Sequence, residues 1–274
     1  MTVIEQSTGT KSPLSGDTNG RIWGLRAADW ANIQEQQCAP AYHAVFKKGD
    51  LGPETCLLDA GCGAGMALTL ASELGAHISG IDASLALLEI ARRRLPDAKL
   101  AHGDIEKLPF DDNAFDVVTG FNSFQFAADP IAALKEARRV TKLGGHVFVM
   151  TWGEPVGMEA AALVAALKPL LPPSPPGAGG PFALSEPGKL ETLATSAGLT
   201  PIEVFDVEAA WHYVDLATAQ KGLGSSGVAA KAAEISGQDA LDAAHATALF
   251  PYRQSDGSYR IGATFRVLMA GKDA

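Results

Sequence analysis

The stretch that most constrains the fold of this chain is residues 56–65, with the sequence CLLDAGCGAG. Leu57 and Leu58 close an apolar run typical of a buried strand, and three glycines then alternate over five residues. Helix formers follow at residues 66–71. Because glycine tolerates positive φ and has no Cβ, a strand, a glycine turn and a helix in this order let the backbone approach a nucleotide-like ligand closely. We therefore predict an α/β fold with a ligand at this turn.

An acid in front of the glycines narrows the choice of ligand. A dinucleotide would place its pyrophosphate at the N-terminus of the helix, where the Asp59 carboxylate would repel it. The spacing G-x-G-x-G also differs from the dinucleotide fingerprint G-x-G-x-x-G. Both observations disfavour a nicotinamide oxidoreductase. The carboxylate suits a ligand that carries an ammonium and a sulfonium and no phosphate, which describes S-adenosylmethionine.

Residues 58–65, LDAGCGAG, resemble the first motif of the class I S-adenosylmethionine-dependent methyltransferases, in particular the ubiquinone/menaquinone-type branch that methylates small molecules. The resemblance is strong over residues 55–151 and weak in the flanks. It implies a Rossmann-like, seven-stranded methyltransferase sheet, mostly parallel with an antiparallel last strand, plus helical cap segments. The alternative for the loop alone is a glycine-rich turn that binds nothing. The cofactor-binding residues that we predict are Asp59, Gly61, Cys62, Gly63, Gly65, Asp82, Ala83, Asp104, Ile105 and Asn122.

Two further acids follow at the ends of expected strands. Asp82 closes the second strand, where an acid can accept hydrogen bonds from both ribose hydroxyls; alternatively, Asp82 or Ser84 caps the next helix. Asp104 follows the third strand and opens the segment DIEKLPF, which is similar to the family's second signature. The resemblance implies that Asp104 accepts from the adenine amino group while the Ile105 amide donates to a ring nitrogen. The alternative is a carboxylate that stabilises a turn.

The fourth expected strand, residues 114–121, ends at the topological switch point, where open α/β sheets bind ligands. Residues 122–125 read NSFQ and not the Asn/Asp-Pro-Pro-Tyr of nucleic-acid amino-methyltransferases, which argues against that subclass. We expect this segment to face the methionine part of the cofactor and the methyl acceptor. For a tryptophan in the N-terminal helices, packing on the sheet is the alternative. The substrate-site residues that we predict are Trp30, Gln125, Phe126, Trp152 and Trp211.

The rest of the chain is organised around this centre. We predict a single methyltransferase domain over residues 21–274, preceded by a mobile tail over residues 1–20 that is rich in Ser, Thr, Gly and Lys. A sixth strand is expected at residues 200–207, followed by helices, and a last strand of alternating pattern at residues 259–269. Cap segments are expected at about residues 21–48, 152–190 and 208–255.

The composition excludes several kinds of partner. Lys and Arg number 22 against 31 Asp and Glu, a net charge of −9, whereas nucleic-acid binding usually needs a basic face. No apolar run approaches the ~20 residues of a membrane span, and residues 1–20 lack the apolar core of a signal peptide, so we expect a cytoplasmic protein. The three cysteines show no disulfide or zinc spacing, so we expect no metal and interpret Cys62 as a small spacer. The expected partner is a small-molecule methyl acceptor, and the oligomeric state stays open.

Two functions are compatible with these patterns: methyl transfer from S-adenosylmethionine to a small, apolar or aromatic metabolite, and a non-catalytic cofactor-binding or interaction module. The complete set of glycines and acids favours the first. Because a sulfonium is already an activated leaving group, positioning can contribute most of the acceleration, and a general base is needed only if the acceptor must lose a proton. His212 and His245 are weak candidates for that base, since each is better explained as a surface or packing histidine. No catalytic residue is assigned.

Overall fold

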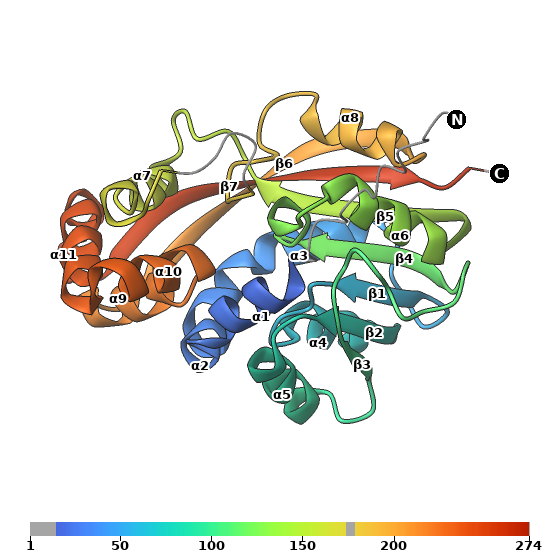
Figure 1. Ribbon diagram of the computed structural model, residues 1–274, viewed down its shortest axis with the longest axis horizontal. Coiled ribbons are helices and arrows are strands. Elements are labelled where there is room, and N and C mark those ends of the chain that lie inside the picture. Colours follow the sequence, from blue (N-terminus) through green and yellow to red (C-terminus); the bar gives the residue numbers. More distant parts are fainter. Residues whose placement is uncertain (1–14, 174–178, 274) are drawn as a thin grey trace, which may run out of the picture.

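The computed structural model describes residues 15–173 and 179–273. Its centre is one sheet of seven strands in the order β3-β2-β1-β4-β5-β7-β6 (Figure 1). The strands are, in chain order, β1 (Cys56–Ala60), β2 (His77–Asp82), β3 (Lys99–His102), β4 (Phe115–Phe121), β5 (Thr141–Trp152), β6 (Thr200–Tyr213) and β7 (Tyr259–Gly271).

The directions of the strands confirm the predicted fold class. β1 pairs in parallel with β2 and β4, β2 with β3, and β4 with β5. β7 lies between β5 and β6 and is antiparallel to both. After β3 the chain returns to the other side of β1, so the strand order reverses between β1 and β4. The carboxyl ends of these two strands form the crevice in which open α/β sheets bind ligands.

Helices cover both faces of the sheet and its carboxyl end (Figure 1). Pro40 lies in the first turn of α3, where a missing N–H costs nothing, so this proline begins a helix. The helical segments are α1 (Gly16–Gly24), α2 (Ala27–Asp29), η1 (Trp30–Gln34), η2 (Glu35–Cys38), α3 (Ala39–Lys48), α4 (Met66–Glu73), α5 (Leu85–Arg94), η3 (Phe124–Phe126), α6 (Pro130–Val140), α7 (Glu159–Ala165), η4 (Lys168–Leu170), α8 (Lys189–Ser196), α9 (Leu216–Gly224), α10 (Gly227–Ser236), α11 (Gln238–Leu249) and η5 (Phe250–Tyr252).

β5 shows how the sheet divides the apolar core. Phe148 and Met150 belong to the cluster that includes α3 and α4, whereas Val147 and Val149 pack with α6 and α8. The division follows from the pleat, because successive side chains of a strand point to opposite faces. Each fully buried side chain of this kind contributes about 1.5–3 kcal/mol. The central strands are therefore stabilised from both sides, and the glycine turn after β1 starts from a rigid base.

The helices α7, α9, α10 and α11 gather at one end of the molecule, and the long strands β6 and β7 extend to them (Figure 1). Together with α1 and α2 they cover the carboxyl ends of the central strands, so residues from all three expected cap segments meet there. Within the described ranges, no helix has the length and apolar character to cross a membrane.

Two predicted boundaries are wrong. The tail was expected to reach residue 20, but α1 begins at Gly16; residues 1–14 lie outside the described part of the chain. The sixth strand was expected to end at residue 207 with helices from 208, but β6 continues to Tyr213. Its last residues pair with β7, Trp211 with Ile261 and Tyr213 with Tyr259. Because the partner strand lies about fifty residues further along the sequence, local pattern alone did not reveal this extension.

Candidate functional site

The glycine turn lies at the carboxyl end of β1 and is fixed by the neighbouring strand. The backbone N–H groups of Gly61 and Cys62 both donate to the Ile81 carbonyl oxygen, at 2.8 and 3.0 Å. Gly61 has a φ of +89°, and a Cβ at this position would lie 2.4 Å from the Cβ of Ser123. Glycine is therefore required here both by conformation and by the close approach of the segment after β4.

Asp82 joins the glycine turn to the start of α5. Its Oδ2 accepts from the Gly63 N–H at 2.8 Å, and its Oδ1 accepts from the Ser84 N–H at 2.8 Å. The hydroxyl of Ser84 accepts from the Leu87 N–H, so Ser84, and not Asp82, is the N-cap of α5. Burial raises the pKa of Asp82, and the two backbone hydrogen bonds oppose that shift. The Asp82 carboxylate is thus held in one orientation.

An ion pair between a buried carboxylate and a partly exposed arginine supports the other side of the turn. Glu35 accepts from the Met66 N–H at 3.1 Å and pairs with Arg94 at 2.6 Å, and Arg94 also donates to the Ala64 carbonyl oxygen at 2.9 Å. A carboxylate at the N-terminus of α4 is favourable because of the helix dipole. Burial raises the pKa of Glu35, and Arg94 counteracts the shift. Nothing in the sequence distinguishes Arg94 from the two arginines before it.

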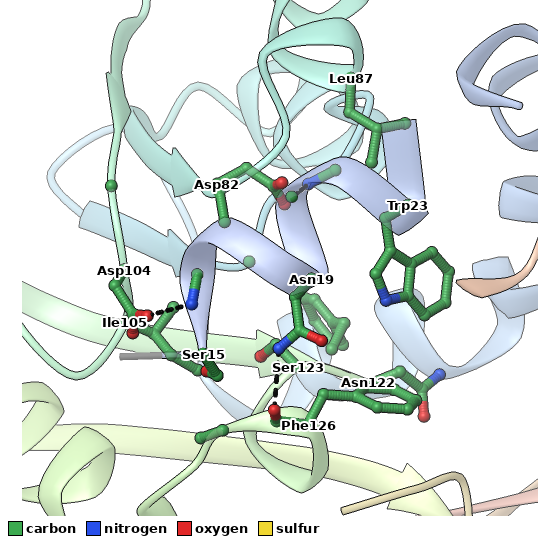
Figure 2. Close-up of a pocket in the computed structure, with 18 of the residues that line it drawn as sticks. Ser15, Asn19, Trp23, Asp82, Leu87, Asp104, Ile105, Asn122, Ser123 and Phe126 are labelled. Carbon is green, nitrogen blue, oxygen red and sulfur yellow. Dashed lines mark hydrogen bonds between the residues drawn. The ribbon is translucent and has the colours of Figure 1, made fainter. Parts of the chain in front are cut away.

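The helix α1 crosses the mouth of the crevice (Figure 2). Its first N–H, from Gly16, donates to Asp104 Oδ2 at 2.5 Å, and Asn19 Nδ2 donates to the Phe126 carbonyl oxygen at 2.9 Å. Gly20 packs directly on Ala83, where an added Cβ would lie 2.1 Å from the carbonyl oxygen. The helix therefore contacts the segments after β2, β3 and β4 at once.

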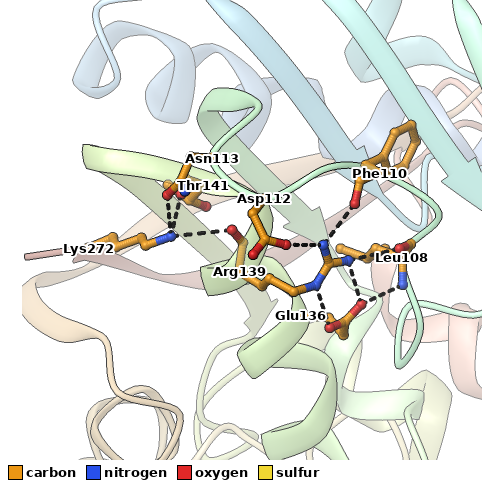
Figure 3. Close-up of polar contacts among 8 residues, drawn as sticks. All are labelled: Leu108, Phe110, Asp112, Asn113, Glu136, Arg139, Thr141 and Lys272. Carbon is orange, nitrogen blue, oxygen red and sulfur yellow. Dashed lines mark hydrogen bonds and ion pairs between the residues drawn. The ribbon is translucent and has the colours of Figure 1, made fainter.

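The loop after Asp104 is held from behind by Arg139, at the C-terminal end of α6 (Figure 3). All five of its N–H groups are used: they donate to both carboxylate oxygens of Glu136, to Asp112 Oδ1, and to the carbonyl oxygens of Leu108 and Phe110, at 2.7 to 2.9 Å. Glu136 in turn accepts from the Leu108 N–H at 2.9 Å. The family's Leu-Pro-Phe turn is thus fixed by a guanidinium that lies far from it in sequence.

A cavity of about 110 Å³ lies between α1 and the glycine turn. No lysine or arginine is among the described residues that line it, whereas two aspartates are. Its wall therefore suits a cationic ligand without phosphate, which fits the chemistry of S-adenosylmethionine. Trp30 and Phe126, predicted for the substrate, line it as well. Seven predicted cofactor residues meet here: Gly61, Gly63, Asp82, Ala83, Asp104, Ile105 and Asn122.

Three predicted cofactor residues lie behind this wall. Asp59 is 2% exposed and accepts from the Thr119 hydroxyl at 2.8 Å; burial raises its pKa to about 7, with Asp82 and Glu35 adding to the shift. Cys62 is buried against Gly80, and burial raises the pKa of its thiol, which agrees with a spacer. Gly65 packs against Ala91 of α5.

A second cavity, of about 70 Å³, lies between the sheet and the cap helices. Trp30, Phe126, Trp152 and Trp211 line it, and so does His245. The rings of Trp152 and Trp211 meet edge to face, with centroids 5.3 Å apart.

Two further predicted site residues, Gln125 and His212, line neither cavity. Gln125 is buried beside this second cavity but does not line it, and its Nε2 donates to Asn122 Oδ1 at 3.0 Å. His212 is exposed and lines neither cavity, because it alternates with the buried Trp211 along β6.

The sequence missed several wall residues. Asn19 was assigned to the tail and Leu87 was not singled out, yet both line the first cavity; Ser123, which was expected to face the ligand only as part of the segment after the fourth strand, lines it as well. Asn122 adopts a φ of +54°, a conformation that asparagine tolerates better than most residues. The only signal in the sequence for Ser123 was its position after the fourth strand. The first half of α1, residues 16–20, carried no such signal, because it reaches the site only through the tertiary fold.

The fold and this crevice define one class: the chain contains a domain of the class I S-adenosylmethionine-dependent methyltransferases. Residues 58–149 match the family model described as a methyltransferase domain. That range holds the glycine turn, both later acids and the segment after β4.

Two curated relatives match part of the chain, and one of them is named as a methyltransferase. A demethylmenaquinone methyltransferase from Staphylococcus aureus (strain JH9) is 37% identical over 124 residues, which make up 41% of this chain and 52% of the relative. An uncharacterised 37.1 kDa protein in transposon TN4556 of Streptomyces fradiae is 36% identical over 148 residues, 50% of this chain and 42% of the relative. The chain thus spans about half the length of the curated relatives it matches.

Solved structures share the fold over most of the chain. The [4+2]-cyclase SpnF has a TM-score of 0.62 at 22% identity, covering 97% of this chain and all (100%) of SpnF. The YcgJ protein of Bacillus subtilis has a TM-score of 0.56 at 17% identity, covering 85% of this chain and 98% of YcgJ. Identities this low show the fold alone. Since one of the two is described as a cyclase, the reaction must be argued from the site.

Proposed function

We propose that this chain transfers the methyl group of S-adenosylmethionine to a small, apolar or aromatic acceptor. The observation that carries the proposal is a shared wall: Trp23, Trp30, Asn122 and Phe126 line both cavities. An acidic cavity at the glycine turn and an apolar cavity are therefore adjacent. Direct transfer needs this arrangement, because the reacting atoms must approach within about 3–3.5 Å.

The residues of the first cavity suggest how the cofactor would be held. We expect Asp82, which is fixed by two backbone amides, to accept from the ribose hydroxyls, and Asp104 and Ile105 to contact adenine. The amino-acid end would lie at the glycine turn, near Asn122. Asp59 lies behind the turn, so its proposed contribution is a buried negative charge that favours a cationic ligand.

The chain itself has little chemistry to perform. When bound, S-adenosylmethionine supplies a methyl group on a sulfonium, which needs no further activation. Trp30 and Phe126 would orient the reactants and exclude water at the shared wall. Burial lowers the pKa of His245 to about 4, which makes it a poor base at pH 7, and His212 lies outside both cavities. We therefore propose no general base and assign positioning as the main contribution.

Cofactor binding would require α1 to move. The first cavity measures about 110 Å³, whereas sites for ligands of this size usually span about 300–1,000 Å³. The Gly16 N–H also occupies one oxygen of Asp104, the proposed partner of adenine. We propose that α1 opens to admit the cofactor and then closes over it, as lids do in many enzymes.

An apolar acceptor is supported by the aromatic wall of the second cavity and by the name of the S. aureus relative, which designates a quinone substrate. That relative matches 41% of this chain. We therefore extend to this chain only the class of compound, an apolar ring system, and not the compound itself.

The test has two parts on the full chain. Calorimetry with S-adenosylmethionine measures cofactor binding, and methyl-labelled tritiated cofactor with a metabolite library measures transfer. We expect micromolar binding and label in an apolar product. Binding without transfer to any acceptor would instead support a cofactor-binding module. Absence of cofactor binding would contradict the proposal altogether.

A further inference from the structure

Two buried polar groups at the second cavity have no hydrogen-bond partner. They are Trp211 Nε1 and His245 Nδ1. Trp211 is 2% exposed and His245 is 1% exposed, so bulk water does not satisfy either nitrogen. Buried polar atoms in proteins are nearly always hydrogen-bonded, and an exception calls for a specific explanation. Two such exceptions on one cavity point to a ligand that supplies the missing partners.

Both side chains are closely packed by their neighbours. Trp211 lies in β6, and Trp152 packs edge to face against it with centroids 5.3 Å apart. His245 lies on α11, on the same buried face as Leu241 and Leu249. The two residues therefore approach the cavity from the sheet and from the cap.

The cavity wall carries no formal charge. Of the described residues that line it, none is Asp, Glu, Lys or Arg. Burial lowers the pKa of His245 to about 4, against an opposing effect of Asp242, so the imidazole is neutral at pH 7. An ionised carboxylate, phosphate or ammonium on the acceptor would be buried without a counter-charge in the wall of this cavity, which is unfavourable.

We infer that Trp211 and His245 select an uncharged ring compound with an oxygen substituent, the indole N–H donating to that oxygen and the imidazole pairing with a hydroxyl. This inference rests on the proposed function, because it names the acceptor class of the same site. Trp211 can only donate, so its partner must be a hydrogen-bond acceptor, and an uncharged carbonyl, hydroxyl or ether oxygen supplies one. The apolar wall around the pair accounts for the ring.

Binding of model acceptors to the full chain, with saturating S-adenosylhomocysteine, tests this inference without any methyl transfer. The probes are 2-naphthol, naphthalene and 2-naphthoate, which share a ring system and differ in an uncharged oxygen, no polar group and a charge. Ligand-observed NMR gives their dissociation constants. We expect wild-type protein to bind 2-naphthol most tightly and 2-naphthoate most weakly.

The variants separate hydrogen bonding from packing. Trp211→Phe keeps an aromatic ring and His245→Leu keeps the bulk, and each should weaken 2-naphthol about fivefold or more while changing naphthalene less than about twofold. Trp152→Phe is the matched control, since it removes an indole N–H from the same wall; it should change both probes equally. Thermal melts identify a variant that does not fold, and the other variant then decides.

Three results would overturn the inference: no binding of 2-naphthol to wild type, binding of 2-naphthoate as tight as that of 2-naphthol, or equal loss of 2-naphthol and naphthalene in the variants. The last result would show that Trp211 and His245 act only as packing. Failure of the proposed function gives a different result. In that case no methyl transfer is found with any acceptor, while the selectivity among the three probes and its loss in the variants persist.

Discussion

Asp82 connects three parts of the site at the scale of a single side chain: its oxygens accept from Gly63 in the turn and from Ser84 before α5, and its carboxylate lies on the cavity wall. We predict that Asp82→Ala weakens S-adenosylmethionine binding by about 1.5–3 kcal/mol, the range for hydrogen bonds to a charged group. Calorimetry measures the change. The variant should also melt at a lower temperature, because two backbone amides lose their acceptor.

Asp116→Ala is the matched control for this change. Asp116 also accepts from a backbone amide, that of Cys56 at 2.9 Å. It lies near the amino end of β4, however, whereas the cavity lies at the carboxyl end of the strand. The control should lose stability and keep its cofactor affinity. If both variants lost affinity equally, the loss would reflect general destabilisation and the ribose assignment of Asp82 would be wrong.

The raised pKa of Asp59 predicts that the affinity for the cofactor depends on pH. Burial raises its pKa to about 7, so the free protein holds a proton there below that pH. A cationic ligand favours the carboxylate, and the complex therefore binds fewer protons than the free protein. Affinity for S-adenosylmethionine should rise with pH, by up to about tenfold per unit below pH 7, and then level off. Calorimetry between pH 5.5 and 7.5 measures this slope.

The variant Asp59→Asn should bind more weakly at pH 7.5 and show a flatter profile. The raised pKa of Asp59 also makes the stability of the free protein depend on pH, but in the opposite direction to cofactor affinity. Since the folded state holds the extra proton, the free energy of unfolding should fall as pH rises from the ordinary aspartate pKa of 3.8 to about 7. A slope of cofactor affinity that is unchanged in Asp59→Asn would assign the titration to another group.

At the scale of elements, α1 is the part of the site that must move. Asn19 holds it to η3 through the Phe126 carbonyl oxygen. We predict that Asn19→Ala speeds association of S-adenosylmethionine about fivefold, because one hydrogen bond of about 1 kcal/mol no longer resists opening. Stopped-flow tryptophan fluorescence measures the rate.

Arg21→Ala serves as the control for α1. Arg21 is on the same helix and pairs with Glu234 of α10 at 2.5 Å, but this pair is exposed and contributes little. S-adenosylmethionine should associate with the Arg21→Ala variant at a rate within about twofold of wild type. Unchanged association in Asn19→Ala would mean that the cofactor enters without displacement of α1.

The ion pair between η2 and α5 predicts a large loss of stability. The Glu35 side chain is 4% exposed, and Arg94 is its only cation within salt-bridge distance among the described residues. Arg94→Ala would leave a buried carboxylate unpaired and should cost about 3 kcal/mol in chemical denaturation. Arg93→Ala, a change one residue earlier on the exposed side of α5, should stay within about 0.5 kcal/mol. Equal effects would contradict the structural role of the pair.

At the scale of the whole molecule, the net charge predicts that the protein does not bind nucleic acid. The net charge is −9, and the first cavity adds two aspartates without a lysine or arginine among its described lining. We predict no binding of labelled duplex DNA or transfer RNA at micromolar protein and low salt, measured by fluorescence anisotropy. Salt-sensitive micromolar binding would reveal a basic patch that the overall charge conceals, and would reopen the question of the acceptor.

The sequence by itself determined the sheet and the position of the ligand turn. These features depend on local chemistry: an apolar strand, alternating glycines that permit positive φ, and acids directly after the second and third strands. The helices from residue 85 and from residue 130 were equally predictable, because Ser84 and Asp129 provide N-caps next to apolar periodicity.

Only the tertiary structure decided which residues share a wall. It moved Asp59 and Gly65 behind the turn, brought α1 across the crevice, and extended β6 so that Trp211 meets His245 at one cavity. These relations join residues far apart in the chain, and no local spacing encodes them. Burial decides them as well: a histidine in a helical segment becomes an unpartnered neutral imidazole only when a strand and a neighbouring helix exclude water from it.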